Sequence, residues 1–322
     1  MPGSISSGGI FRMTSDTLTM KHILSVEKML QVVPIAQLGH IRDNTVYTLL
    51  EKFNLCGSIK VKAVYWMIKN AFQRGDLTEG KTILEASSGN TAIALAYIGK
   101  LFGFPVLLVI PKDTGSCKKE LMRSYGANLI EIDGITDDCI DFRNRMAERK
   151  PTEYFVLDQF NNPDNPEAHY HLTAPYIVDK LGKIDFFVAG LGTAGTLIGA
   201  GKYLKERFPE IRIVAINPLD RIEGIKNYHT LRNIGQFYTD NKHLIDDVID
   251  VVFDDDVVPG LNDYLSEGYF NGVSSGAILT GTKRFLQGKK GLTGIIVAPD
   301  GGDYYLSEII HLLDPKQVKA CQ

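Results

Sequence analysis

The chain has 322 residues, a length that predicts either two domains or one large domain. Its composition is that of an ordinary globular protein, with 44% hydrophobic residues, 23% charged residues and a formal net charge of −3. A general nucleic-acid-binding protein would carry an excess of basic residues, so we expect no nucleic-acid partner. The basic pairs Lys118-Lys119 and Lys289-Lys290 are short, and we expect both on solvated faces.

The residues that commonly bind metals show no metal-site pattern. The four cysteines, at positions 56, 117, 139 and 321, are widely spaced and give neither zinc-site spacing nor a disulfide framework. His169 and His171 are two residues apart, and on a helix they would face different directions. We therefore expect packing or surface roles for both histidines, and no metal site.

The sequence shows no membrane-targeting pattern. No apolar run reaches the roughly 18 residues of a membrane span. Residues 1–20 are rich in Gly and Ser and lack the apolar core of a signal peptide. We expect a cytoplasmic protein without a membrane partner, in which residues 1–20 form a disordered tail.

Short apolar runs alternate with helical patterns along most of the chain. The runs that predict strands are residues 32–38, 45–50, 82–86, 105–111, 128–133, 154–160, 184–190, 211–217, 248–253 and 294–300. The patterns that predict helices are residues 62–75, 90–103, 117–127, 139–150, 174–182, 197–208, 258–269 and 277–288. Such alternation is typical of βαβ units, which build parallel sheets covered by helices. We therefore predict an α/β fold and expect ligand-binding residues in the loops that follow the strands.

Lys60 lies in the segment LCGSIKVK, directly before an apolar helical pattern. A single lysine is usually a solvated surface charge. Lys60, however, lies between Ile59 and Val61, and burial among apolar side chains lowers the pKa of an amine and makes it nucleophilic. Lys60 is therefore a candidate catalytic residue.

Residues 87–91, SSGNT, connect a predicted strand to a predicted helix. Ser87, Ser88, Asn90 and Thr91 offer hydroxyl and amide groups beside the free backbone N–H groups of the helix N-terminus, and together these groups can bind an anion. Serine and asparagine are also ordinary N-cap residues. The local sequence leaves both interpretations open.

Residues 189–204, AGLGTAGTLIGAGKYL, follow another predicted strand. Gly190, Gly192 and Gly195 let the backbone approach an anion closely, and Thr193 and Thr196 add hydroxyls, so this loop favours a phosphate group. The glycine spacing also matches the dinucleotide-binding pattern, which supports a nicotinamide-dependent oxidoreductase as an alternative of another class. That pattern normally lies in the first βαβ unit of a nucleotide-binding domain, whereas here it lies past the middle of the chain.

A reactive lysine and a separate phosphate site are the minimum that pyridoxal phosphate needs, because its aldehyde bonds the lysine and its phosphate anchors the ring. Six segments then resemble, in the same order, the cysteine synthase (O-acetylserine sulfhydrylase) and cystathionine β-synthase family of pyridoxal-phosphate enzymes, of fold type II. These segments are NLCGSIK, EASSGNTAIALA, DQFNNPDNPEAHY, GLGTAGTLIGAGKYLK, EGYFNGVSSGA and PDGGDYYLS. The resemblance extends from about residue 33 to residue 306.

The resemblance implies a tryptophan-synthase-β-like architecture with two domains rich in parallel sheet and the cofactor in the cleft between them. Residues 54–165 would form a smaller, mobile, substrate-binding domain. Residues 21–53 and 166–322 would form the larger, cofactor-binding domain. The family resemblance also implies a homodimer.

Roles carry over from the family by position. The resemblance implies that Lys60 is the Schiff-base lysine, that Asn90 bonds the ring hydroxyl and that Ser275 lies near the cofactor. It implies a phosphate site made of Gly192, Thr193, Ala194, Gly195 and Thr196. It implies a site for the substrate carboxylate made of Ser87, Ser88, Asn90, Thr91 and Gln159.

The sequence departs from the family pattern near the expected site. Asn233 and Gln236 stand in a segment that is usually glycine-rich, and we expect them to narrow the substrate pocket or to position a polar nucleophile. The serine that faces the pyridine nitrogen in relatives corresponds to Gly301. The neighbouring Asp300 is therefore a candidate cofactor contact that would alter the proton affinity of the ring.

The resemblance implies β-replacement on serine, O-acetylserine or cysteine through an aminoacrylate intermediate, with small amino-acid substrates and a small sulfur nucleophile. The favoured reaction is synthesis of cysteine and acetate from O-acetylserine and sulfide. Alternatives with the same residues are a cysteine lyase or desulfhydrase that releases sulfide, a cystathionine β-synthase and a diaminopropionate-type synthase. A catalytically silent regulatory homologue is an alternative of another class.

Overall fold

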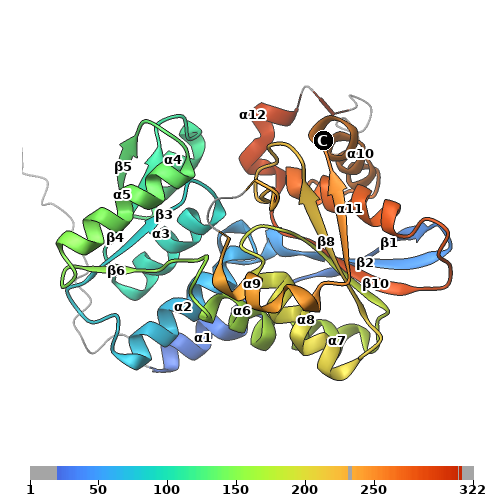
Figure 1. Ribbon diagram of the computed structural model, residues 1–322, viewed down its shortest axis with the longest axis horizontal. Coiled ribbons are helices and arrows are strands. Elements are labelled where there is room, and N and C mark those ends of the chain that lie inside the picture. The colour runs from blue at the N-terminus through green and yellow to red at the C-terminus, as the bar shows by residue number, and fades with distance from the viewer. Residues whose placement is uncertain (1–19, 231–233, 311, 314–322) are drawn as a thin grey trace, which may run out of the picture.

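The computed structural model describes residues 20–230, 234–310 and 312–313, and in these residues the chain forms two sheets flanked by helices (Figure 1). The larger sheet has six strands in the order β1-β2-β10-β7-β8-β9, and the smaller has four in the order β5-β4-β3-β6. All neighbouring strands are parallel except β1 and β2, which pair antiparallel with Ile35 opposite Leu49. The predicted α/β fold with sheets rich in parallel strands is confirmed.

The strands of the larger sheet are β1 (Ile35–Ile41), β2 (Asn44–Leu50), β7 (Phe186–Gly190), β8 (Arg212–Pro218), β9 (Asp247–Val251) and β10 (Thr293–Ala298). Those of the smaller sheet are β3 (Thr82–Ala86), β4 (Val106–Pro111), β5 (Asn128–Ile132) and β6 (Tyr154–Val156). The α-helices are α1 (Met20–Leu30), α2 (Lys60–Arg74), α3 (Asn90–Phe102), α4 (Ser116–Ser124), α5 (Thr136–Arg149), α6 (Asp164–Ala168), α7 (Ala174–Leu181), α8 (Gly195–Arg207), α9 (Gln236–Asn241), α10 (Val258–Ser266), α11 (Val273–Phe285) and α12 (Leu306–Ile309).

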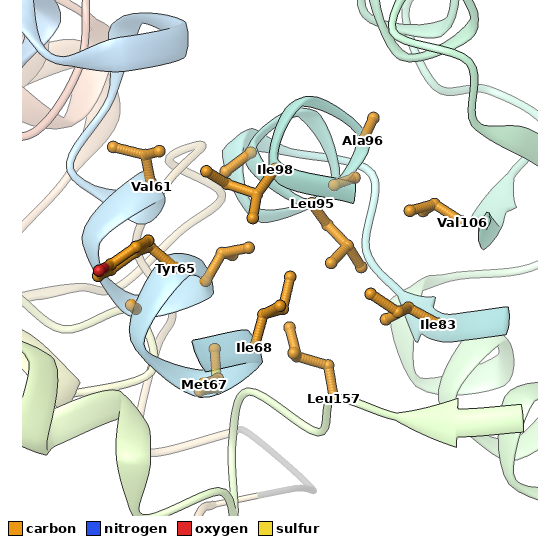
Figure 2. Close-up of a cluster of buried hydrophobic side chains, with 14 of the residues drawn as sticks. Val61, Tyr65, Met67, Ile68, Ile83, Leu95, Ala96, Ile98, Val106 and Leu157 are labelled. Carbon is orange, nitrogen blue, oxygen red and sulfur yellow. The ribbon is translucent and has the colours of Figure 1, made fainter. Parts of the chain in front are cut away.

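Helix α2 connects the two halves of the molecule. It contacts α3 beside the smaller sheet and α6 beside the larger one, and α6 in turn contacts α8. Figure 2 shows Tyr65 and Ile68 of α2 in one cluster with Leu95 of α3, and all three side chains are buried. Each buried side chain of this size contributes about 1.5–3 kcal/mol relative to exposure, so packing holds α2 in place. The domain boundaries at residues 54 and 165 remain a prediction.

Several elements differ from the sequence expectations. No predicted helix covered α1, α6, α9 or α12. The strand expected over 154–160 ends at Val156, because Asp158 adopts a left-handed conformation (φ 49°) that a strand cannot continue through. The strand expected over 32–38 begins at Ile35, after Pro34, which has no N–H group to pair.

A buried ion pair fixes the first turns of α2 to the segment after β2. Lys62 Nζ lies 2.5 Å from Glu51 Oε1, and neither side chain is exposed. Asn54 Nδ2 donates to the other carboxylate oxygen of Glu51 at 2.8 Å. Both oxygens of the buried carboxylate therefore have partners.

We expect Lys62→Met to lower the free energy of unfolding by about 3–5 kcal/mol, because it leaves the Glu51 carboxylate buried without its cation. Urea unfolding measures the change. Lys150→Met is the control, since the Lys150–Glu153 pair is exposed, and it should leave the unfolding curve in place. Equal curves for Lys62→Met and the wild type would show that the buried pair does not support α2.

Candidate active site

The loop before α2 is joined to the end of β10. Ile59 N donates to Pro299 O at 2.9 Å, and Ser58 forms an isolated antiparallel bridge with Asp300. The backbone therefore fixes where α2 begins. Lys60, the first residue of α2, is held at the carboxyl end of β10, where ligand sites of parallel sheets lie.

Lys60 points toward the glycine-rich loop between β7 and α8. A Cβ atom added to Gly192 would lie 3.5 Å from Lys60 Nζ and 3.0 Å from Gly224 O, so a side chain at position 192 would fill the space beside the amine. Burial lowers the pKa of the Lys60 ammonium below its ordinary value, and the charge of Asp300 opposes that shift. The lowered pKa increases the share of neutral, nucleophilic amine, which agrees with the sequence prediction.

Residues 192–196 approach neighbouring segments too closely for larger side chains. A Cβ atom on Gly195 would lie 2.1 Å from Asn165 Oδ1. Ala194 adopts a left-handed conformation (φ 68°), which costs a non-glycine residue about 1–2 kcal/mol. The N-cap residue of α8, Ala194, has no capping side chain, and beyond Gly195 N, which donates to Thr193 Oγ1, N–H groups of the first turn remain available for an anion.

Asp300 lies at the centre of a buried polar network. Its Oδ2 atom accepts hydrogen bonds from Asn90 Nδ2 at 2.6 Å and from Tyr305 Oη at 2.7 Å. Burial raises the pKa of the Asp300 carboxyl, while the two hydrogen bonds and the charges of Lys118 and Lys60 act in the opposite direction. The structure therefore brings Asp300 and Asn90 together close to Lys60.

Several buried polar atoms around Asp300 have no hydrogen-bond partner among the residues that the structure describes. Their residues bond or bridge to Asp300 or Gly301, or lie within a few positions of a residue that does. The atoms are Ser58 Oγ, Asn90 Oδ1, Asn271 Nδ2, Asn271 Oδ1, Ser274 Oγ, Ser275 Oγ and Asp300 Oδ1. Each buried polar group left unpaired costs about 1–3 kcal/mol. Such a concentration indicates a binding site for a polar ligand.

The SSGNT loop leaves the N-terminus of α3 open. Gly89 is the N-cap residue, and no side chain caps the helix, so the simple capping interpretation does not hold. Ser87 is buried and Ser88 partly exposed, and Thr91 Oγ1 donates to Gln159 Oε1 at 2.6 Å. The structure thus brings Thr91 and Gln159 together beside free N–H groups that suit an anion.

One predicted substrate residue, Gln236, stands apart from this network, and another lies outside the described residues. The Gln236 side chain is exposed and donates to Asp240 Oδ1 at 2.7 Å on the same helix. Asn233 lies outside the described residues. Their roles stay predictions.

The expectation that Lys118 lies on a solvated face is wrong. Lys118 of α4 is 4% exposed, forms an ion pair with Glu223 and lies 4.5 Å from the ring centroid of Tyr305. The basic pair Lys118-Lys119 gave no sign of this contact, because both partners are far away in the sequence. The ion pair joins the helices of the smaller sheet to the segment beside Gly192.

The two histidines of EAHYH face different directions, as their spacing predicted. His171 is exposed and stacks on Trp66 with ring centroids 5.1 Å apart. His169 is buried, and its Nε2 atom lies 3.3 Å from Thr196 Oγ1 in the glycine-rich loop. Sequence reasoning did not connect His169 to this loop.

We expect the lowered pKa of Lys60 to make the free energy of unfolding of the ligand-free protein depend on pH. The unfolded chain keeps the ordinary lysine pKa of about 10.4, so between the lowered pKa and that value it binds a proton that the folded chain does not. The free energy of unfolding therefore rises with pH in this window. Lys60→Met should remove the rise and increase stability at neutral pH. Urea unfolding between about pH 7 and 9.5 tests this, and equal slopes for both proteins would contradict it.

Comparison with known proteins agrees with this geometry. A family model described as pyridoxal-phosphate-dependent enzyme matches residues 23–299. A cysteine synthase of Aquifex aeolicus is 36% identical over 275 residues, covering 82% of this chain and 83% of the relative. Among the residues that the structure describes, no helix has the length and apolar character needed to cross a membrane.

Solved structures of related enzymes share the fold. A hydrogen sulfide-producing enzyme of Fusobacterium nucleatum superposes with a TM-score of 0.81 at 30% identity, covering 87% of this chain and 97% of the other. An O-acetylserine-dependent cystathionine β-synthase of Helicobacter pylori superposes with a TM-score of 0.77 at 30% identity, covering 88% and 97%. This chain therefore belongs to the pyridoxal-phosphate-dependent enzymes and, among them, to the cysteine synthase family.

Proposed function

We propose that this enzyme is a cysteine synthase that converts O-acetylserine and sulfide to cysteine and acetate. The observation that carries the proposal is the partly buried Lys60 amine, with its lowered pKa, beside the glycine-rich loop. The match to curated cysteine synthases supports β-replacement as the reaction class. The choice of O-acetylserine and sulfide is our proposal.

The residues present fit pyridoxal phosphate. A Cβ atom on Gly192 would occupy the space beside Lys60 Nζ, and the unpaired buried atoms of Asn90, Ser274 and Ser275 offer hydrogen-bonding groups for a polar ring. We propose that Lys60 bonds the aldehyde and that residues 192–196 hold the phosphate. Asn90, Ser275 and Asp300 would contact the ring.

When bound, the cofactor supplies an electron-withdrawing ring that stabilises negative charge at the substrate Cα. The Lys60 Nζ atom, whose neutral fraction is increased by its lowered pKa, would take the proton from the substrate Cα and later return it. Asp300 keeps the Asn90 amide in a fixed orientation through the 2.6 Å hydrogen bond. The chain thus holds a base and its positioning partners in one buried network.

The proposed site of the substrate carboxylate is the N-terminus of α3. Ser87, Ser88, Asn90 and Thr91 surround its uncapped N–H groups, and Gln159 bonds the Thr91 hydroxyl. These groups bind an anion without adding a titrating charge. The Lys118–Glu223 pair joins α4 to the opposite segment, which would help to exclude water during the reaction.

A second candidate is breakdown of cysteine with release of sulfide. The structural match to a hydrogen sulfide-producing enzyme favours it, because the same base and carboxylate site serve both reactions. We also propose a homodimer and a cytoplasmic location, on the family resemblance and on composition. Light scattering of the purified protein measures the oligomeric state.

Product analysis separates the two candidate reactions. We expect the purified protein to form cysteine from O-acetylserine and sulfide faster than it releases sulfide from cysteine alone. Lys60→Ala should lower the rate by at least about 1000-fold, because the proton acceptor at Cα is lost. Faster sulfide release from cysteine would replace the synthase proposal by the second candidate.

The same assays test whether the protein is catalytic at all and whether Lys60 is the base. A cofactor-loaded protein that turns over neither substrate mixture would favour a silent regulatory homologue. Full activity of Lys60→Ala would contradict the assignment of the base. Lys226→Ala is the matched control, since burial also lowers the pKa of Lys226, yet we assign it no catalytic role.

A further inference from the structure

A buried helical segment supports the glycine-rich loop from behind. Helix α6 continues directly into a π-helical turn, His169–Thr173. Asn165 and His169, four residues apart on this segment, are each 2% exposed and face the two threonine hydroxyls of the loop. Such π-helical insertions often occur at functional sites.

Asn165 controls the hydroxyl of Thr193. Its Nδ2 group donates one hydrogen to Thr193 Oγ1 at 2.9 Å and the other to Gln159 O at 2.8 Å. Gly195 N also donates to Thr193 Oγ1, at 3.3 Å. A hydroxyl oxygen has two lone pairs, and both are engaged here, so the Thr193 hydrogen is left to point away from Asn165 as a donor.

His169 has the corresponding position at Thr196. Its Nδ1 atom lies 3.0 Å from the buried Thr173 Oγ1, and its Nε2 atom lies 3.3 Å from Thr196 Oγ1. We take the Thr173 hydroxyl as the donor to Nδ1, which places the ring hydrogen on Nε2 and makes the ring the donor to Thr196. The Thr196 hydrogen is then free to donate elsewhere.

The surroundings of His169 keep its ring neutral. Burial lowers the pKa of His169 well below its ordinary value, and the charges of Lys62 and Lys60 lower it further. A neutral ring has one donor and one acceptor, which matches its two threonine partners.

We propose that Asn165 and His169 are positioning residues that fix the hydroxyls of Thr193 and Thr196 as hydrogen-bond donors toward the phosphate monoester of the cofactor. The inference rests on the proposed assignment of residues 192–196 as the phosphate site. A phosphate monoester dianion accepts hydrogen bonds and offers no donor at neutral pH, so hydroxyls fixed as donors complement it. Asn165 also bonds Gln159, the partner of Thr91, and so connects the phosphate site to the carboxylate site.

The test compares pyridoxal phosphate with pyridoxal, which lacks the phosphate. Apoprotein of the wild type should bind pyridoxal phosphate much more tightly than pyridoxal. His169→Leu should weaken binding of pyridoxal phosphate by about 10- to 100-fold, the range for losing a hydrogen bond to a charged group, and leave binding of pyridoxal unchanged. His169→Gln, which keeps an amide N–H donor, should lose less.

A double-mutant cycle shows whether His169 affects cofactor binding through Thr196. Because His169 acts through the Thr196 hydroxyl, His169→Leu should add almost nothing to the loss already caused by Thr196→Val. The phosphorus NMR resonance of bound pyridoxal phosphate should shift in His169→Leu. His171→Gln is the matched control on the same segment and should change neither affinity.

Two results would overturn the inference by showing a general structural role. One is an equal loss of affinity for pyridoxal phosphate and for pyridoxal in His169→Leu, and the other is additive losses of affinity in the cycle. If His169→Leu does not fold, His169→Met, which also lacks an N–H donor, gives the same cycle when combined with Thr196→Val. A wild type that binds both compounds equally would instead refute the phosphate site at residues 192–196. The two failures are therefore distinguishable.

Discussion

The position of the Lys60 amine is the constraint on which the rest of the site depends. The amine is fixed because α2 begins where Ile59 bonds the end of β10, and because the apolar face of α2 packs on α3. An ammonium group in this place would lose hydration, and the carboxylate whose charge acts on it, Asp300, already shares its Oδ2 with Asn90 and Tyr305. The lowered pKa of the amine is thus a consequence of the fold, and a larger neutral, nucleophilic fraction follows from it.

Unpaired polar atoms in the site lower the stability of the ligand-free protein, and a ligand that bonds them can remove this cost. Unpaired buried atoms of Ser58, Asn90, Asn271, Ser274, Ser275 and Asp300 collect where four chain segments meet. Elsewhere the described residues pair buried charges well, as Lys62 with Glu51 and Arg143 with Glu85. The contrast indicates that the polar atoms around Asp300 are shaped for binding, and a ligand that pairs them stabilises the folded state.

The sequence was sufficient for most of the fold and for the identity of the central residues. Alternating strand and helix patterns predicted the sheets, and local motifs pointed to Lys60, Asn90 and residues 192–196. The contacts of Lys118 with Glu223, and of His169 with Thr196, were not predictable, because they join residues 105 and 27 positions apart whose side chains look ordinary in the sequence. Helix α1 and the short strand β6 were missed or misjudged, since single residues such as Asp158 decide where such elements end.

The most direct test of the account is borohydride reduction of the holoenzyme, followed by proteolysis and mass spectrometry of the peptides. Reduction makes the bond between a lysine and the cofactor aldehyde permanent. We expect fragmentation of the peptides to place the cofactor mass on Lys60, and none on Lys62 or Lys226. An unmodified Lys60 with the cofactor mass on another lysine, or on none, would contradict the central claim.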